Sequence, residues 1–140
     1  MKQQAKSTIQ RSTDHSNNHE EALSRLAAIV ESSDDSIIGT TLDGTITSWN
    51  SAAEAIYGYR PDEVKGRPIS ILIPPDRDDE MPQIFEKIKR GEKIRHYETV
   101  RLTKDGRKID VSITISPIKG SAGTIIGASA IARHRAGSRV

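Results

Sequence analysis

Cysteine is absent from this 140-residue chain, and long apolar runs are absent as well. Without cysteine there are no disulfides, no thiolate metal sites and no cysteine nucleophile. No run approaches the roughly 18 apolar residues of a membrane-spanning helix, and the polar first residues lack the apolar core of a signal peptide. The formal net charge is only +2, which indicates no nucleic-acid surface unless basic residues cluster. We therefore expect a cytoplasmic domain without membrane contact.

Aromatic residues are scarce at 4%, yet Trp49, Tyr57 and Tyr59 lie close together in the sequence. Two interpretations follow. The three rings line a binding site, or they complete a modest single-domain core built mainly from Ile, Val, Leu and Ala.

Composition divides the chain into four segments. Residues 1–19 are polar and without periodicity, which is typical of a flexible tail. A helix is predicted over 20–33, a folded core over 34–133 and a short basic tail over 134–140. His15 and His19 are four residues apart, but no carboxylate or thiolate partner accompanies them, so we expect no metal site.

The helix over 20–33 is amphipathic. Its apolar stripe follows the i, i+3, i+4, i+7 spacing and comprises Leu23, Leu26, Ala27 and Val30. Such a stripe packs on its own domain or forms a dimer interface, and both interpretations stay open.

Turn and cap signals organise the next segment. Asp43-Gly44 and Asp105-Gly106 each stand between β-rich runs and predict hairpins with type I′ turns. The sequence SAAE from Ser51 to Glu54 predicts a helix capped by the Ser51 hydroxyl. Pro61 suits the first position of a second short helix.

A longer helix follows Pro74-Pro75. Because proline is tolerated only in a first turn, Pro82 predicts that this helix starts no earlier than about Asp78. The charge run DRDDE at 76–80 is interpreted as a solvated helix start rather than a catalytic carboxylate cluster.

The last third is β-structure. Apolar Ile109, Val111, Ile113 and Ile115 alternate with polar residues, which predicts a strand with one buried face. Together with the first hairpin, three final strands predict a five-stranded antiparallel sheet with short helices and one longer helix on one face, an α+β fold.

This order resembles the PAS domain, a sensory module of bacterial signalling proteins. The segments that carry the resemblance are WN-x-AAE-x-x-x-GY, the IPP that follows, KDG, VSITISPI and GTIIGAS, and the similarity spans residues 23–133. One departure is that His134-Arg135-Ala136 stand where such domains usually have Asp-Ile-Thr before a signalling helix. The resemblance implies a truncated or stand-alone module, or one whose output is binding to a separate partner.

The resemblance also bears on cofactors. Glu80 occupies the position of the proximal histidine of haem-binding relatives, and His96 on a strand is a poor substitute, so haem is not expected. The lack of cysteine excludes a cysteinyl flavin, whereas a non-covalent flavin or small ligand remains open. Such a ligand is expected between the sheet and the long helix, in a candidate pocket of Ile71, Met81, Phe85, Ile88, Ile113, Ile115 and Asn50. The alternative is that these side chains fill the core.

Three functions stay in competition. The first is a regulatory module in two-component signalling or transcription control, forming a homodimer and acting on a histidine kinase or other effector. The second is a ligand or flavin sensor in its own right. The third, a nucleic-acid binder, rests on the few basic residues Arg133, Arg135 and Arg139. No catalytic motif is present, so any enzyme activity belongs to a sensor histidine kinase or diguanylate cyclase of which the chain is a fragment or partner.

Overall fold

A computed structural model describes residues 18–135 of the chain. Of the predicted tails over 1–19 and 134–140, residues 1–17, including His15, and residues 136–140 lie outside the described part. Residues 18 and 19, predicted as tail, are instead the first residues of a helix. The described chain comprises a helix over residues 18–32 and a separate unit that starts at Ser33.

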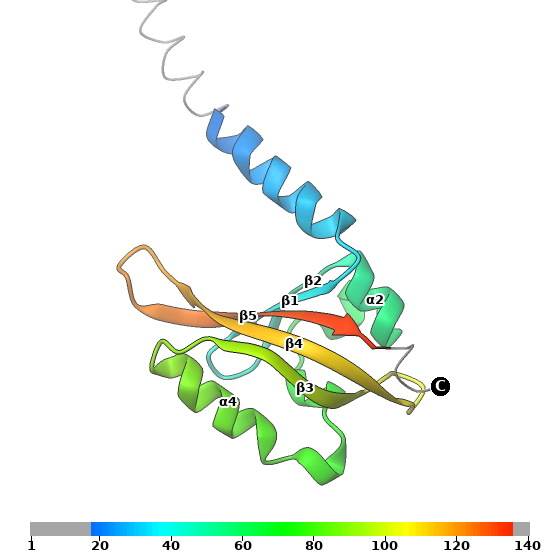
Figure 1. Cartoon of the computed structure of the whole chain (residues 1–140). Helices are drawn as coiled ribbons and strands as arrows, with labels where there is room; N and C mark the ends of the chain where they lie inside the picture. Colours follow the sequence, from blue (N-terminus) through cyan, green and yellow to red (C-terminus); the bar gives the residue numbers. More distant parts are fainter. Residues whose placement is uncertain (1–17, 136–140) are drawn as a thin grey trace, which may run out of the picture. The chain divides into compact units, whose positions relative to one another are not determined.

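The second unit is an antiparallel sheet of five strands in the order β2-β1-β5-β4-β3 (Figure 1). The elements follow one another as β1 (Ser36–Thr41), β2 (Ile46–Trp49), α2 (Ser51–Tyr57), α3 (Pro61–Val64), η1 (Ile69–Leu72), η2 (Pro75–Arg77), α4 (Glu80–Lys89), β3 (Ile94–Leu102), β4 (Lys108–Lys119) and β5 (Ile125–His134). The predicted α+β fold is confirmed, with one hairpin joined to a three-stranded meander through β1 and β5.

The two sheet halves meet closely at Gly127 of β5. A Cβ atom there would lie 2.1 Å from the Thr40 carbonyl oxygen of β1. The small residues of β5 therefore allow β1 to approach, which joins the hairpin to the meander.

The core lies between the sheet and the helices. The alternation of β4 points Ile109, Val111, Ile113 and Ile115 inward, as predicted. Helix α4 packs on β3 and β4, and α2 packs on β1. Trp49 and Tyr57 are buried in this core with ring centroids 5.7 Å apart, and the Trp49 Nε1–H donates to the Tyr59 carbonyl at 3.0 Å. The aromatic cluster is thus part of the core.

The Asp-Gly hairpins differ from the type I′ prediction. Gly44 and Gly106 have positive φ angles, but among the described residues the only non-glycine with positive φ is His96. Asp43 and Asp105 therefore have negative φ, and each loop is a type I turn followed by a left-handed glycine. In each case the aspartate accepts a hydrogen bond from the threonine two residues earlier, and Gly44 N–H donates to the Thr41 carbonyl at 3.1 Å.

The cap of α2 is also different from the prediction. Asn50, not Ser51, is the N-cap residue, and its Oδ1 accepts from the Ala53 amide at 3.0 Å. The helix ends at Gly58, which has a φ of 86° and donates to the Glu54 carbonyl.

Candidate functional site

A cleft of about 400 Å³ lies where η2 and the start of α4 meet β3. Residues from the three elements line it: Asp76, Arg77, Asp79, Glu80, Gln83, Ile84, Lys87, Ile94 and Tyr97. Its size is within the usual range for small-molecule sites.

Two periodicities bring these side chains together. On α4, Glu80, Gln83, Ile84 and Lys87 follow the i, i+3, i+4, i+7 spacing, so they share one face of the helix. On β3, Thr99 is paired with Val111 and Arg101 with Ile109, so both side chains project to the inner face of the sheet. Polar residues of β3 therefore face the first turn of α4.

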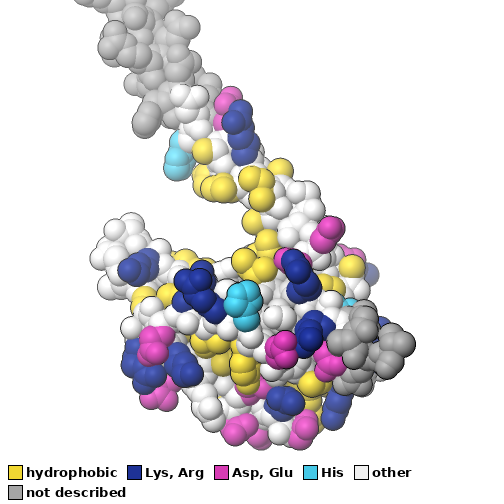
Figure 2. All heavy atoms as spheres, viewed as in Figure 1, with side chains coloured by type: hydrophobic (Ala, Val, Ile, Leu, Met, Phe, Trp, Pro, Cys, Tyr) yellow, Lys and Arg dark blue, Asp and Glu magenta, His cyan; other side chains and the backbone are white. Residues whose placement is uncertain are grey.

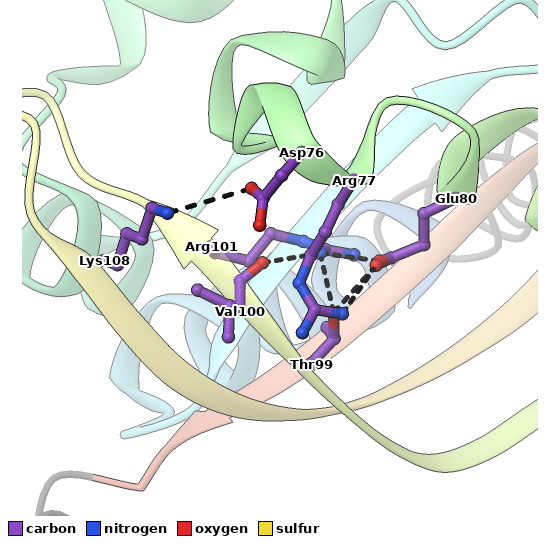
Figure 3. Close-up of polar contacts among 7 residues, drawn as sticks. All are labelled: Asp76, Arg77, Glu80, Thr99, Val100, Arg101 and Lys108. Atoms are coloured by element: carbon purple, nitrogen blue, oxygen red, sulfur yellow. Dashed lines mark hydrogen bonds and ion pairs between the residues drawn. The ribbon is translucent and has the colours of Figure 1, made fainter.

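A buried ion pair connects these two elements. Glu80 and Arg101 side chains are only 7% and 4% exposed, and Glu80 Oε1 lies 2.7 Å from Arg101 Nη1. The Thr99 hydroxyl donates to Glu80 Oε2 at 2.8 Å. Arg101 Nη1 also donates to the Val100 carbonyl at 2.9 Å. Figure 3 shows the carboxylate and the guanidinium turned toward each other across the space between α4 and β3.

Arg77 brings a second cation to the same carboxylate. Its Nη1 lies 3.6 Å from Glu80 Oε2 and donates to the Thr99 hydroxyl at 3.3 Å, while its side chain remains 40% exposed. The neighbouring Asp76 is directed instead toward Lys108, at 3.8 Å (Figure 3). Arg77, which lines the cleft, and the buried Arg101 thus place two guanidinium groups around one carboxylate.

The sequence predicts that the charge run at 76–80 is solvated, and this prediction is wrong for Glu80. Asp76, Asp78 and Asp79 are exposed, but Glu80 is buried. Sequence reasoning missed Glu80 and Arg101 as the two partners of a buried ion pair. The signal that could have identified Arg101 is the period-two spacing of Tyr97, Thr99 and Arg101, which places the three side chains on one face of a strand.

Two tyrosines near this cluster titrate above their ordinary range. Burial, supported by the negative charge of Glu80, raises the pKa of Tyr97. Burial raises the pKa of Tyr57 to about 12, and the positive charge of Arg101 only partly opposes this.

The seven predicted pocket residues lie in other places. Ile88, Ile113 and Ile115 are buried in the hydrophobic core, and Ile71, Met81 and Phe85 pack against it. None of the seven lines the cleft of about 400 Å³. That they hold a ligand stays a prediction.

Asn50, the seventh, is buried beside the first strand. Its Oδ1 accepts from the Ile37 amide at 2.9 Å as well as from Ala53, and its Nδ2 donates to the Asp35 carbonyl at 3.0 Å. In this structure Asn50 joins the start of β1 to the start of α2.

The predicted dimer-interface residues lie on the helix over residues 18–32. Leu23 and Leu26 are 54% and 60% exposed, Ala27 is exposed and Val30 is partly buried. Ile29, which the predicted stripe omitted, is 63% exposed.

Within 18–135 no three His, Cys, Asp or Glu side chains are grouped so as to hold a metal ion. No helix in that part of the chain has the length and apolar character needed to cross a membrane.

Comparison with known proteins gives a consistent result. A family profile described as PAS fold matches residues 24–135. The signal transduction histidine-protein kinase AtoS of Escherichia coli is 32% identical over 103 residues, which are 74% of this chain and 16% of AtoS. The chain therefore spans less than a fifth of that curated relative.

Two solved structures share the fold closely. The PAS domain of a protein from Colwellia psychrerythraea has a TM-score of 0.75 and 27% identity, covering 81% of this chain and 96% of that one. The PAS domain of an HTR-like protein from Haloarcula marismortui has a TM-score of 0.72 and 28% identity, covering 87% and 98%.

Proposed function

The chain belongs to the PAS family of signal-transduction sensor modules, and from that premise we propose that it regulates a signalling pathway through protein–protein interaction. Its first contact is with a second copy of itself, through the helix over residues 18–32. Its output partner is a histidine kinase or another effector of two-component signalling or transcription control. The module itself is not catalytic.

The apolar surface of the N-terminal helix is the observation that carries this proposal. Leu23, Leu26 and Ile29 are each more than half exposed, and hydrophobic side chains run along the helix (Figure 2). Leu23, Leu26 and Val30 have the 3-4 spacing of a coiled-coil seam. Exposed apolar stripes of this kind mark association surfaces.

The similarity to AtoS supports a histidine kinase as the partner. AtoS is named as a signal transduction histidine-protein kinase, and the similarity covers only 16% of it. We propose that this chain regulates a histidine kinase or a diguanylate cyclase, either as a fragment of that enzyme or as a separate partner.

Light scattering after size exclusion tests the proposed homodimer. We expect twice the chain mass for the wild type and the single-chain mass for Leu23→Glu/Leu26→Glu, because charges at a helix seam disrupt pairing. Ser24→Glu/Ala28→Glu is the matched control: it adds two carboxylates to the same helix, on the opposite side. A wild-type monomer, or a dimer that tolerates both double variants, would contradict self-association through this helix.

The cleft at the start of α4 favours a second candidate function, direct sensing of a small ligand. A non-covalent flavin is one version of it, and near-ultraviolet and blue absorbance of the purified protein tests it. A colourless protein with no bound species in its native mass spectrum would rule out the flavin. Nucleic-acid binding has less support, because acidic and basic side chains are interspersed on the face shown in Figure 2.

A further inference from the structure

We propose that the cleft between α4 and β3 binds a small carboxylate, with Arg77 as the residue that holds its charge. This inference deepens the proposed function and rests on it, since it names the chemical class of signal that the module senses.

Glu80, Arg101 and Arg77 together carry one more positive charge than negative charge. Glu80 is already neutralised by Arg101, whose Nη1 lies 2.7 Å away with both side chains buried. The Thr99 hydroxyl donates to Glu80 Oε2 at 2.8 Å. The charge of Arg77 is therefore not needed to compensate Glu80, and its contact with that carboxylate is long, at 3.6 Å.

Arg77 is nevertheless held in place. It donates to the Thr99 hydroxyl at 3.3 Å, and its guanidinium points into the cluster in Figure 3. Its side chain keeps 40% of its surface open to solvent at the cleft. A positioned and partly desolvated guanidinium is suited to a carboxylate, which it can bind through two parallel N–H donors.

Apolar side chains line part of the cleft, where they can contact the body of a small carboxylate. Ile84, Ile94 and Tyr97 provide apolar surface beside Arg77, and Lys87 places a second cation two helical turns beyond Glu80. Of the acidic side chains, Asp76 is directed to Lys108. Asp79 also lines the cleft but is exposed, so water screens its charge.

Isothermal titration of the full chain with benzoate and hexanoate tests the proposal, with benzamide as an uncharged probe of the same shape as benzoate. Backbone amide NMR shifts locate the site. We expect at least one carboxylate to bind with a Kd on the order of 1 mM and to shift residues of α4 and β3 that line the cleft. We expect Arg77→Gln to weaken that binding about tenfold or more. Arg90→Gln, the same charge change at the exposed far end of α4, serves as the control and leaves the Kd unchanged.

Three results would overturn the proposal: no saturable binding of either carboxylate, equal affinity for benzamide and benzoate, or unchanged binding in Arg77→Gln. The outcome is separable from that of the light-scattering test. A dimer that binds neither carboxylate removes this inference alone, whereas a monomer that binds through Arg77 removes only the proposed self-association.

Discussion

Asn50 shows how much a single buried amide can organise in a small domain. Its Oδ1 accepts from the amides of Ile37 and Ala53, and its Nδ2 donates to the Asp35 carbonyl. One side chain thereby satisfies backbone groups from both the strand and the helix that it joins. Buried backbone groups left without partners are costly.

Replacing Asn50 with alanine is therefore expected to lower the free energy of unfolding by about 3 kcal/mol, from a lost cap and unpaired buried groups. Asn50→Asp keeps the accepting oxygen but sets a second buried oxygen against the Asp35 carbonyl, so it is also expected to lose stability. Chemical denaturation measures both. A greater loss for Ser51→Ala than for Asn50→Ala would instead favour Ser51 as the cap.

The raised pKa of Tyr57 predicts that the folded chain loses stability at alkaline pH. Burial raises the pKa of Tyr57 to about 12 in the folded chain, whereas the pKa of an unfolded tyrosine is about 10. Between pH 10 and 12 the unfolded chain releases the Tyr57 proton more readily than the folded chain does. The contribution of this group to the free energy of unfolding is therefore complete below pH 10 and is lost as pH rises toward 12. Unfolding free energies should fall by about 1 kcal/mol between about pH 10 and 11 from this group. Tyr57→Phe should lack this part of the decrease, and equal slopes in the two proteins would contradict it.

At the scale of elements, the Glu80–Arg101 pair fixes the first turn of α4 to β3. It is buried, whereas pairs such as Arg90–Glu92 are exposed. Removing one partner of a buried pair leaves the other charge uncompensated, while removing both does not.

A double-mutant cycle follows from this difference. Glu80→Gln and Arg101→Met should each cost about 3 kcal/mol of unfolding free energy, and the double variant should cost clearly less than their sum. Arg90→Gln, which breaks an exposed pair, should cost less than about 1 kcal/mol. Additive losses at Glu80 and Arg101 would show that the two charges do not act together.

Local signals predicted most elements. Pro82 restricted the start of α4, the Asp-Gly pairs located both hairpins, and the alternation around Ile113 identified the buried face of β4. These features depend on neighbours in the chain. The details that differed are local ambiguities: Asn50 and Ser51 are both good cap residues, and Asp-Gly suits two kinds of turn.

The cleft could not be predicted in the same way. Glu80 ends a run of exposed charges, and its partner Arg101 is far along the chain on another element. Only the register that pairs Arg101 with Ile109 turns its side chain inward beneath α4. The apolar face of α4 predicts a pocket around Phe85 and Ile88, whereas the cleft lies on the face that carries Glu80, Gln83 and Lys87.

The whole molecule combines a PAS fold, a cleft with a positioned cation and a helix with an exposed apolar stripe. We propose above all that the helix over residues 18–32 mediates self-association and that the sheet unit provides the sensing surface.

Hydrogen–deuterium exchange at high and low protein concentration tests that claim most directly. Amides of residues 18–32 should exchange more slowly at high concentration, because pairing at Leu23 and Leu26 protects the helix. The buried strands of the sheet unit, such as β4, provide the internal control and should be unaffected by dilution. Exchange of the helix that is equally fast at both concentrations would contradict the account.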